Sequence, residues 1–359
     1  MCAVCQAQER MERTAVRRGF VFGDDRPFRE CHASTLVALD DGGFLAAWFG
    51  GTKEKNPDVA IWTAKCRAGV WSAPIKTMKI RQEAHWNPVL FRDETGTVYL
   101  FFKVGKEIAV WETWVALSND EGATWSEPVE LVAGNKGGRG PVRNKPIILT
   151  DGTWLAGASY ESDQGDQRWD VFVDRSEDGG KTWEATPYLA LDRSRFNGKG
   201  VIQPTLWESA PGKVHLLVRS TDGKIYRSDS DDYGKSWHAL YATGMPNNNS
   251  GIDLVKMPDG TLVLAYNPIS GNWASRASLS IAFSYDNGVT WPETVVIEND
   301  GAERTEYSYP AIIACGDDRV AFTYTWKRQR IAFGEVEIGK RYRRKLGCQN
   351  GRNNKVTKG

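Results

Sequence analysis

SNDEGATW, residues 118–125, is the first of four copies of one pattern, S-x-D-x-G-x-[ST]-W. The others are SEDGGKTW at 176–183, SDDYGKSW at 230–237 and SYDNGVTW at 284–291. Their first serines are 58, 54 and 54 residues apart, and a degenerate fifth copy, KCRAGVW at 65–71, lies about one period upstream. A fixed period of this length is typical of a repeat architecture.

Each residue type in the pattern has a structural use in a tight turn. The acidic side chain can accept hydrogen bonds from backbone N–H groups, glycine tolerates a positive φ, and tryptophan buries a large ring beside its hairpin. Four similar copies cannot all line one active site. We therefore interpret the aspartates of the pattern as structural rather than catalytic or calcium-binding.

The period also predicts the fold. About 54 residues accommodate four short strands with their turns, which is one propeller blade, and six blades need roughly 324 residues. After Tyr309 only three strands can be placed, and the segment RGFVFG at 18–23 can supply the fourth. We expect an all-β, six-bladed β-propeller of four-stranded antiparallel blades at 17–337, closed by an N-terminal strand. An N-terminal tail (1–16) and a basic, disordered C-terminal tail (338–359) would flank it.

Composition and charge exclude several classes of protein. Hydrophobic residues make up 41% and charged residues 25%, which excludes a disordered chain. No apolar run approaches the roughly 18 residues of a membrane span. Residues 340–359 carry eight basic side chains and no acidic one, so the formal net charge of +1 leaves the rest of the chain near −7. A body of that sign is not expected to bind nucleic acid.

Cysteine usage and the N-terminus give two further expectations. Six cysteines in 359 residues are too sparse for a disulfide scaffold. Cys2 and Cys5 form one CxxC without a second pair, so we expect neither a metal nor a cofactor. The N-terminal segment MCAVCQAQERMERT lacks the apolar region of a secretory signal, which predicts an intracellular location.

The repeated pattern resembles the Asp-box repeats of the sialidase (neuraminidase) superfamily, whose members are six-bladed propellers. The resemblance implies an enzyme that acts on glycans. In that family the first blade carries an Arg-Ile-Pro motif, and a following loop carries an acid/base aspartate. In this chain CHASTLVALDDGGFLAAWFGG (31–51) places His32 where the arginine is expected, and Asp58 lies in the acid/base loop.

Two more arginines complete the family's site for the substrate carboxylate. Arg219 and Arg276 are similar to them in position, and both could make bidentate contacts with a carboxylate. The family nucleophile is a tyrosine in a Tyr-Ser motif, and the segment EYSYP (306–310) resembles it, which implies Tyr307. A phenol avoids the repulsion that a carboxylate nucleophile would meet from the carboxylate on the anomeric carbon.

A phenol has a pKa near 10 and therefore needs a base. The family supplies a glutamate, but the matching segment VIQPTLWES (201–209) has Gln203 at that place. Because an amide cannot accept the proton, we expect Glu161 or Glu306 to act instead.

The chain is similar to the branch of the superfamily known as predicted neuraminidases. The segments AHWNPVLF, RNKPIIL, NNNSGIDLV and EYSYPAII carry this likeness. Their polar residues are expected at inner-strand tips around the central axis, where they would bind substrate or cap turns. These residues are Asn87, Asn144, Lys145, Asn248 and Asp253, and Tyr309 is a further candidate for substrate binding.

Three hypotheses about function follow. The first is an exo-acting retaining glycoside hydrolase that removes a terminal acidic sugar such as sialic acid, with Tyr307 as nucleophile. The second is a lyase acting at a uronic acid through a His and Tyr pair, drawn from His85 or His32 with Tyr160 or Tyr309. The third is a glycan-binding propeller without catalysis, which Gln203 favours. All three imply a glycan partner.

Overall fold

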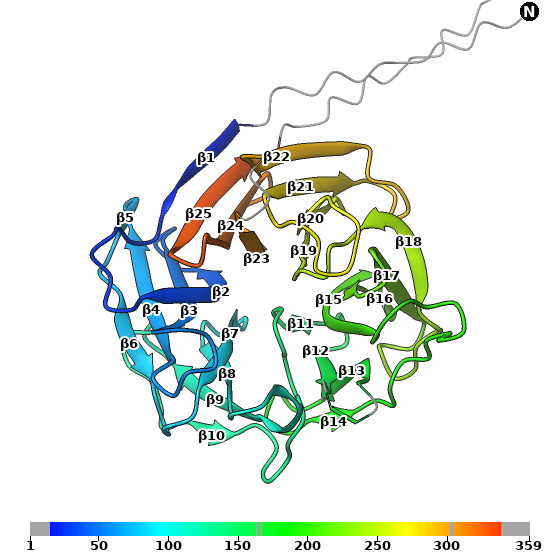
Figure 1. Cartoon of the computed structure of the whole chain (residues 1–359), viewed down its shortest axis with the longest axis horizontal. Helices are drawn as coiled ribbons and strands as arrows, with labels where there is room; N and C mark the ends of the chain where they lie inside the picture. Colours follow the sequence, from blue (N-terminus) through cyan, green and yellow to red (C-terminus); the bar gives the residue numbers. More distant parts are fainter. Residues whose placement is uncertain (1–14, 163, 166, 302–304, 339–359) are drawn as a thin grey trace, which may run out of the picture.

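The computed structural model describes residues 15–162, 164–165, 167–301 and 305–338. In these residues six antiparallel sheets are arranged around a central axis, so the predicted all-β six-bladed propeller is confirmed (Figure 1). The one helical segment among them is a 3-10 turn, η1, at Ile108–Val110. No helix in this part of the chain is long and apolar enough to cross a membrane.

Blades 1 to 3 come from the first half of the chain, and in each the first strand is innermost. Blade 1 contains β2 (Glu30–Ala38), β3 (Phe44–Gly51), β4 (Ala60–Arg67), β5 (Val70–Trp71) and β6 (Ile75–Met78), the last two both paired with β4. Blade 2 contains β7 (His85–Arg92), β8 (Val98–Val104), β9 (Glu112–Ser118) and β10 (Val129–Glu130). Blade 3 contains β11 (Ile147–Ile148), β12 (Trp154–Glu161), β13 (Trp169–Ser176) and β14 (Glu184–Ala185).

Blades 4 to 6 complete the ring. Blade 4 contains β15 (Val201–Ala210), β16 (Lys213–Ser220), β17 (Lys224–Ser230) and β18 (Tyr241–Pro246). Blade 5 contains β19 (Asp253–Lys256), β20 (Leu262–Tyr266), β21 (Ser278–Ser284) and β22 (Glu293–Asn299). Blade 6 contains β23 (Tyr307–Ala314), β24 (Arg319–Trp326), β25 (Arg330–Glu337) and the N-terminal strand β1 (Ala15–Phe20).

Blade 6 joins the two ends of the chain. β1 pairs antiparallel with β25, from Ala15 opposite Glu337 to Phe20 opposite Ala332. The prediction that an N-terminal strand completes the last blade is therefore confirmed. Pairing of this kind removes the open sheet edge that an incomplete ring would leave. The predicted tails fall mostly outside the described residues.

The inner strands contain a recurring irregularity near their N-terminal ends. In blades 1, 2, 4 and 6 the pairing register shifts there, and one residue in the shift has a positive φ. A bulge of this kind redirects a side chain out of the regular alternation of the strand. The residues at this corresponding position are Ala33 (φ 55°), Asn87 (37°), Gln203 (60°) and Tyr309 (52°).

The four Asp boxes occupy the turns between the third and fourth strands of blades 2 to 5. In the box that starts at Ser176, Ser176 Oγ donates to Asp178 Oδ1 and accepts from Gly180 N, while Asp178 accepts from Thr182 N and Oγ1. The boxes at 118, 230 and 284 repeat these four bonds. Each aspartate of the pattern therefore accepts hydrogen bonds within its own turn, in agreement with a structural role.

Candidate functional site

Tyr309 lies where three arginines from three blades meet. The guanidinium carbons of Arg143, Arg219 and Arg276 are 5.3, 5.5 and 5.7 Å from the centroid of its ring. Arg219 Nη1 donates a hydrogen bond to the Tyr309 hydroxyl at 2.7 Å. The ring of His32 lies on Tyr309 with a centroid separation of 4.1 Å. We call these five residues the axial cluster.

Arg143 supports Tyr309 from blade 3. Its Nη2 donates to the carbonyl oxygens of Tyr309 (2.6 Å) and Pro310 (3.0 Å), so it holds the backbone at the residue with positive φ. Its Nε and Nη1 are buried without an oxygen acceptor. Burial lowers the pKa of this guanidinium to about 10, and at neutral pH it remains charged. A buried cation therefore lies directly against the tyrosine.

Arg219 connects Tyr309 with blades 4 and 5. Besides the tyrosine hydroxyl, its Nη1 donates to Gln203 Oε1 at 3.1 Å, and its Nε donates to Asn249 Oδ1 at 3.1 Å. Gln203 and Tyr309 occupy the corresponding bulge position of their blades, which is why one arginine reaches both. The amide oxygens of Gln203 and Asn249 are neutral acceptors, so Arg219 has no carboxylate among these partners.

His32 enters the axial cluster as a neutral ring. It is buried, and burial together with the nearby arginines lowers its pKa well below the ordinary value of 6.5. Thr325 Oγ1 accepts from Ala33 N at 3.3 Å and lies 2.8 Å from His32 Nδ1. A hydroxyl has two lone pairs and one proton, so this contact fits either tautomer of the neutral ring. His32 therefore contributes a neutral hydrogen-bonding ring rather than a positive charge.

Arg276 belongs to a chain of ion pairs at the edge of the axial cluster. Arg276 Nη1 and Arg328 Nε each donate to Glu306 at 2.9 Å, and Arg328 Nη1 also pairs with Glu54 at 2.5 Å. Burial opposes ionisation of Glu306, but Arg328 and Arg276 outweigh it and lower the pKa of this carboxyl. Glu306 is thus an ionised acceptor for two arginines.

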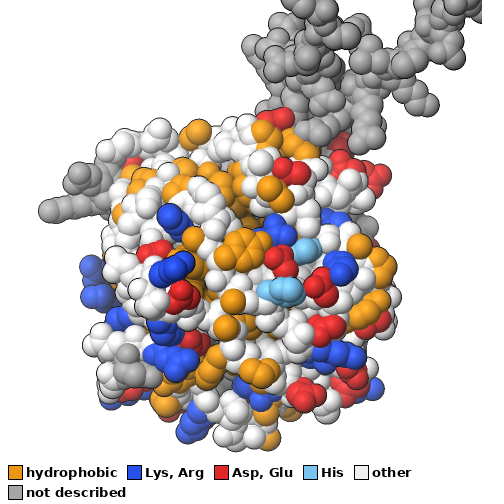
Figure 2. Space-filling model, turned by 90° about the vertical axis from the view of Figure 1, so that its right-hand side faces the viewer, with side chains coloured by type: hydrophobic (Ala, Val, Ile, Leu, Met, Phe, Trp, Pro, Cys, Tyr) orange, Lys and Arg blue, Asp and Glu red, His pale blue; other side chains and the backbone are white. Residues whose placement is uncertain are grey.

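The cluster and these ion pairs together hold four arginines against two carboxylates. On the side of the ring that Figure 2 shows, by contrast, acidic and basic side chains are interspersed. Lys213 and Asp231, for example, form an exposed ion pair at 2.7 Å. The surplus of positive charge is therefore a property of the axis, and it suits an anionic ligand.

Two tryptophans flank the guanidinium of Arg219. Its carbon lies 6.0 Å from the ring of Trp169 and 5.9 Å from that of Trp273, and the two rings contact each other edge to face. Trp273 has a positive φ and leaves 62% of its surface exposed. An exposed indole beside a cluster of cations provides an apolar surface at the border of the site.

Tyr307 does not join the axial cluster. It is buried in the core between blades 5 and 6, where its ring contacts Tyr324 and Trp326. Its hydroxyl donates to Asp300 at 2.8 Å, and burial together with this bond raises its pKa. The expected nucleophile therefore packs between blades, and the bulge two residues later turns Tyr309 towards the arginines instead.

Asp58 faces a different part of the surface. Its Oδ2 accepts hydrogen bonds from the backbone N–H (2.7 Å) and hydroxyl of Thr52. Although partial burial opposes it, these bonds lower the pKa of Asp58. The side chain lines a surface pocket with Arg26, Arg29, Trp62, Lys76 and neighbours. In the same loop it is Glu54 that reaches the ion pairs around Glu306.

Lys145 and Asp253 bind each other. Lys145 Nζ lies 2.9 Å from Asp253 Oδ2, and the same carboxylate accepts from Thr205 Oγ1 and Ile312 N, each at 2.9 Å. One buried aspartate thus links blades 3, 4, 5 and 6. The contacts of this pair are therefore structural, and substrate binding by either residue stays a prediction.

The predicted asparagines also bridge backbone segments. Asn144 Nδ2 donates to the carbonyls of Gln203 and Pro204 at 3.1 Å, and Asn87 Nδ2 donates to the carbonyl of Val142 at 3.1 Å. Asn248 Nδ2 donates to the carbonyl of Ser275 at 2.7 Å. These contacts join parts of the ring that lie 27 to 60 residues apart in the chain, so they are not local turn caps, and substrate binding by these residues stays a prediction.

His85 and Glu161 lie at blade 2 and blade 3. His85 is fully buried and its two ring nitrogens bond Glu83 O and Ile80 N at 2.9 Å, so neither is available to a substrate. Burial lowers its pKa to about 4. Glu161 ends β12, accepts from Ser159 Oγ at 3.4 Å, and its charge acts on the buried Lys103.

Sequence reasoning missed four contributors to the site: Arg143, Arg328, Glu54 and Trp273. A sequence signal for the tyrosine of the axial cluster was present, because a proline follows the bulge residue in Asn87-Pro88, Gln203-Pro204 and Tyr309-Pro310. Aligning these pairs places Tyr309, and not Tyr307, opposite Gln203.

Comparison with protein families gives one match of wide extent. Residues 42–322 match the family described as BNR repeat-like domain. A sialidase of Paraclostridium sordellii is 26% identical over 196 residues, covering 43% of this chain and 48% of that protein. A sialidase of Bacteroides fragilis (strain YCH46) is 24% identical over 240 residues, covering 62% of this chain and 41% of that protein. The matches thus span about half or less of these relatives.

Solved structures agree on the fold. A protein of unknown function from Dyadobacter fermentans has a TM-score of 0.73 at 17% identity, with 90% of this chain and 99% of that chain covered. The Hadza microbial sialidase Hz136 has a TM-score of 0.71 at 17% identity, with 86% and 66% covered. The NanB sialidase of Streptococcus pneumoniae has a TM-score of 0.67 at 15% identity, with 88% and 70% covered.

Proposed function

The chain belongs to the BNR repeat-like family of sialidase propellers, and on this premise we propose that it is a glycoside hydrolase that removes a terminal acidic sugar, sialic acid or a relative, from a glycan. The observation that carries the proposal is the axial cluster, in which three guanidinium groups surround one tyrosine. Guanidinium groups bind carboxylates through paired N–H donors. A substrate carboxylate would replace the neutral amide oxygens of Gln203 and Asn249 as acceptors for Arg219.

Tyr309 is the proposed nucleophile. Its oxygen would attack the anomeric carbon and form a glycosyl-enzyme intermediate that water then hydrolyses, so that the configuration is retained. Gln203 cannot take the phenolic proton, so this proton would pass to solvent water and the tyrosine would react as the phenolate. The three nearby cations would stabilise the negative charge on the tyrosine oxygen.

Protonation of the leaving group needs a separate group. A general acid must hold its proton at the working pH, and the lowered pKa of Asp58 is opposite to that requirement. A leaving group that departs without protonation is therefore the right first probe. We expect the purified protein to release 4-methylumbelliferone from its sialoside, and proton NMR of the product to show the retained anomer first.

The outcomes of this experiment separate the possibilities. Turnover of another acidic glycoside but not of the sialoside would keep the reaction and change the sugar. Turnover with inverted configuration would exclude Tyr309 as nucleophile. Binding of acidic glycans on an array, without turnover by concentrated protein, would instead indicate a glycan-binding propeller.

One observation favours a second candidate, a lyase acting at a uronic acid. His32 is neutral and in ring contact with Tyr309, which provides the His and Tyr pair that β-elimination needs. The arginines would neutralise the uronate carboxylate. This activity predicts an unsaturated product that absorbs near 235 nm, and the absence of that absorbance across uronate-containing glycans would remove it.

A further inference from the structure

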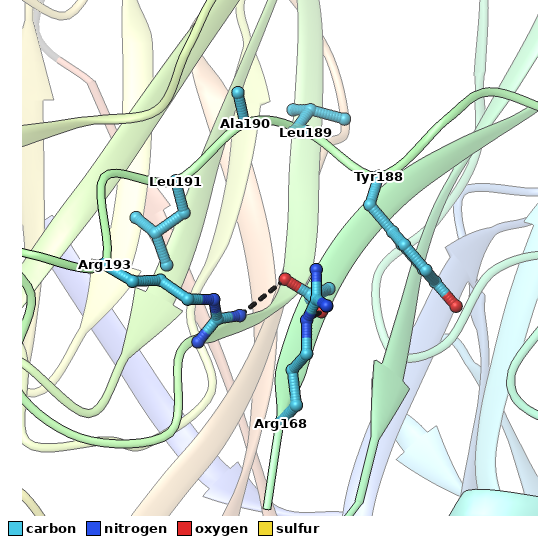
Figure 3. A pocket seen from close by; sticks show the side chains of 7 residues that line it. Arg168, Tyr188, Leu189, Ala190, Leu191 and Arg193 are labelled. Carbon is cyan, nitrogen blue, oxygen red and sulfur yellow. Dashed lines mark hydrogen bonds and ion pairs between the residues drawn. The ribbon is translucent and has the colours of Figure 1, made fainter. Parts of the chain in front are cut away.

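A second pocket lies over blade 3, beside the first residues of β13. Its volume is about 440 Å³, and Figure 3 shows Arg168, Tyr188, Leu191 and Arg193 around it. The segment that follows β14 supplies one wall, and the residues on either side of Trp169 supply the other. Its lining residues are Arg168, Asp170, Tyr188, Leu189, Ala190, Leu191 and Arg193.

The polar part of this pocket is organised by a buried carboxylate. Asp170 is 3% exposed and pairs with both Arg193 Nη2, at 2.6 Å, and Arg168 Nε. Arg193 is also fixed by its bonds to the carbonyls of Lys199 (2.9 Å) and Trp169 (3.1 Å). Two cations share one anion, so the pocket carries a surplus positive charge next to fixed hydrogen-bonding groups.

Tyr188 forms an apolar wall. Half of its surface is exposed, and its ring packs on Phe172 (5.7 Å) and Tyr160 (6.4 Å), which fix its orientation. The guanidinium carbon of Arg168 lies 5.9 Å from the ring. A rigid aromatic face beside charged planar side chains suits a pyranose, whose C–H face packs on the ring while its hydroxyl groups meet the polar atoms.

Trp169 separates this pocket from the axial cluster. Successive side chains of a strand point to opposite faces, so Trp169 points away from its neighbours Arg168 and Asp170. Trp169 contacts Arg219 of the axial cluster, whereas its two neighbours line the pocket. The pocket is tied to Trp169 as well, because Arg193 Nη2 donates to the Trp169 carbonyl. A ligand that occupies both places would pass over the start of β13 and would contain more than one sugar ring.

We propose that the pocket over blade 3 binds the next sugar of the glycan whose terminal residue enters the axial cluster, which makes the substrate an acidic oligosaccharide rather than a simple glycoside. This inference rests on the proposed function for the identity of the terminal sugar. The surplus positive charge favours a sugar that carries a carboxylate or sulfate over a neutral sugar at this second position.

The test compares two substrates with the same terminal sugar: its 4-methylumbelliferyl glycoside and a trisaccharide with an acidic second sugar. Tyr188→Ala and Arg193→Ala should raise KM for the trisaccharide about tenfold, the effect of losing one good contact. Both should leave the kinetics of the umbelliferyl glycoside within about twofold. Arg195→Ala, in the same segment but outside the pocket, is the matched control and should change neither.

Equal effects on both substrates, or no effect on the trisaccharide, would overturn the proposal. Circular dichroism and thermal unfolding establish that each variant is folded, and Arg193→Lys replaces Arg193→Ala if the alanine variant is not. If the wild-type protein cleaves neither substrate, calorimetric binding of the trisaccharide decides. Weaker binding by Tyr188→Ala than by Arg195→Ala would support the pocket even though the proposed reaction had failed, and equal binding would exclude it.

Discussion

The two faces of the propeller differ in how far their residues repeat from blade to blade. On one face the turns between third and fourth strands carry the Asp boxes, and four boxes repeat the same four hydrogen bonds. On the opposite face the inner strands begin, and the corresponding position of each blade holds a different residue. Examples are Ala33, Asn87, Gln203 and Tyr309.

The contrast between the two faces indicates which residues of this repeat protein can form a site. A box stabilises its own hairpin, so every blade can use the same solution. A site at the axis receives side chains from several blades, and identical side chains would give a ring of like groups. Repetition therefore marks structure, and the departures from repetition at the axis mark the candidate site.

The largest expected effect comes from removing the Tyr309 hydroxyl. Tyr309→Phe should lower kcat/KM on the umbelliferyl glycoside by at least about 10³-fold, as loss of a nucleophile does elsewhere. Its thermal stability should change little. Tyr307→Phe is the matched control, which loses the bond to Asp300 and therefore stability of about 1 kcal/mol, with activity retained. The reverse result would restore Tyr307 as the nucleophile.

A second test concerns His85, which lies on the site face but behaves as core. Its pKa is about 4 when folded and about 6.5 when unfolded, so only the unfolded chain takes up a proton as the pH falls between these values. The free energy of unfolding should fall by about 3 kcal/mol from pH 7 to pH 4 on this account. Denaturant melts of His85→Gln should show a smaller decrease of the unfolding free energy between pH 7 and pH 4. His32 and the carboxyl of Glu306 contribute to the wild-type decrease in the same direction.

The control for this pH dependence is His238→Gln, because His238 is exposed on the outer side of blade 4. This variant should keep the full wild-type decrease of the unfolding free energy between pH 7 and pH 4. If the unfolding free energy of His85→Gln decreases with pH as much as that of the wild type, His85 does not cause this pH dependence.

Two buried arginines allow the faces to be compared directly. Arg143 holds the backbone of Tyr309, whereas Arg227 donates to Asn287 O at 2.7 Å within the last Asp box. Arg143→Met should reduce kcat about 100-fold with KM nearly unchanged, since misplacing a reacting group has an effect of this size. Arg227→Met should lose stability only. In the Tyr309→Phe background, Arg143→Met should have no further effect on kcat.

The smallest expected effect is on the box face. Gly180 has φ +81°, and a Cβ there would lie 2.9 Å from the ring of Trp154. Gly180→Ala should lower the free energy of unfolding by about 2 kcal/mol, through strain and overpacking, with unchanged kinetics. Gly179 has φ +73° with open space around it, so Gly179→Ala should lose less. A loss of activity without a loss of stability in Gly180→Ala would show that the two faces are coupled.

The sequence predicts the fold and part of the site, for physical reasons that differ. The box turns are local, so pattern and period suffice to place blades, and the missing outer strand in blade 6 follows from counting. Arg219, Arg276, His32 and Tyr309 come together as expected of site residues. Their roles remain predictions.

The rest of the site depends on geometry that pattern alone does not give. The bulge at Tyr309 reverses the regular alternation of side-chain direction along β23. Tyr307, which the sequence motif indicated, therefore lies in the core, and Tyr309 faces the axial cluster. The pair of Lys145 and Asp253 joins residues 108 positions apart across the axis. Arg143 precedes its inner strand and reaches blade 6, a contact that only the closed ring creates.

Closure by β1 also sets an order of events during synthesis. β1 leaves the ribosome first and its partner β25 last, about 310 residues later. At roughly 5–20 residues per second, β1 waits about 15–60 s for its partner. Throughout that time it is an unpaired edge strand, the kind of segment that associates with other chains. Arg17 and Arg18 within it place positive charge on the waiting strand and so discourage premature pairing.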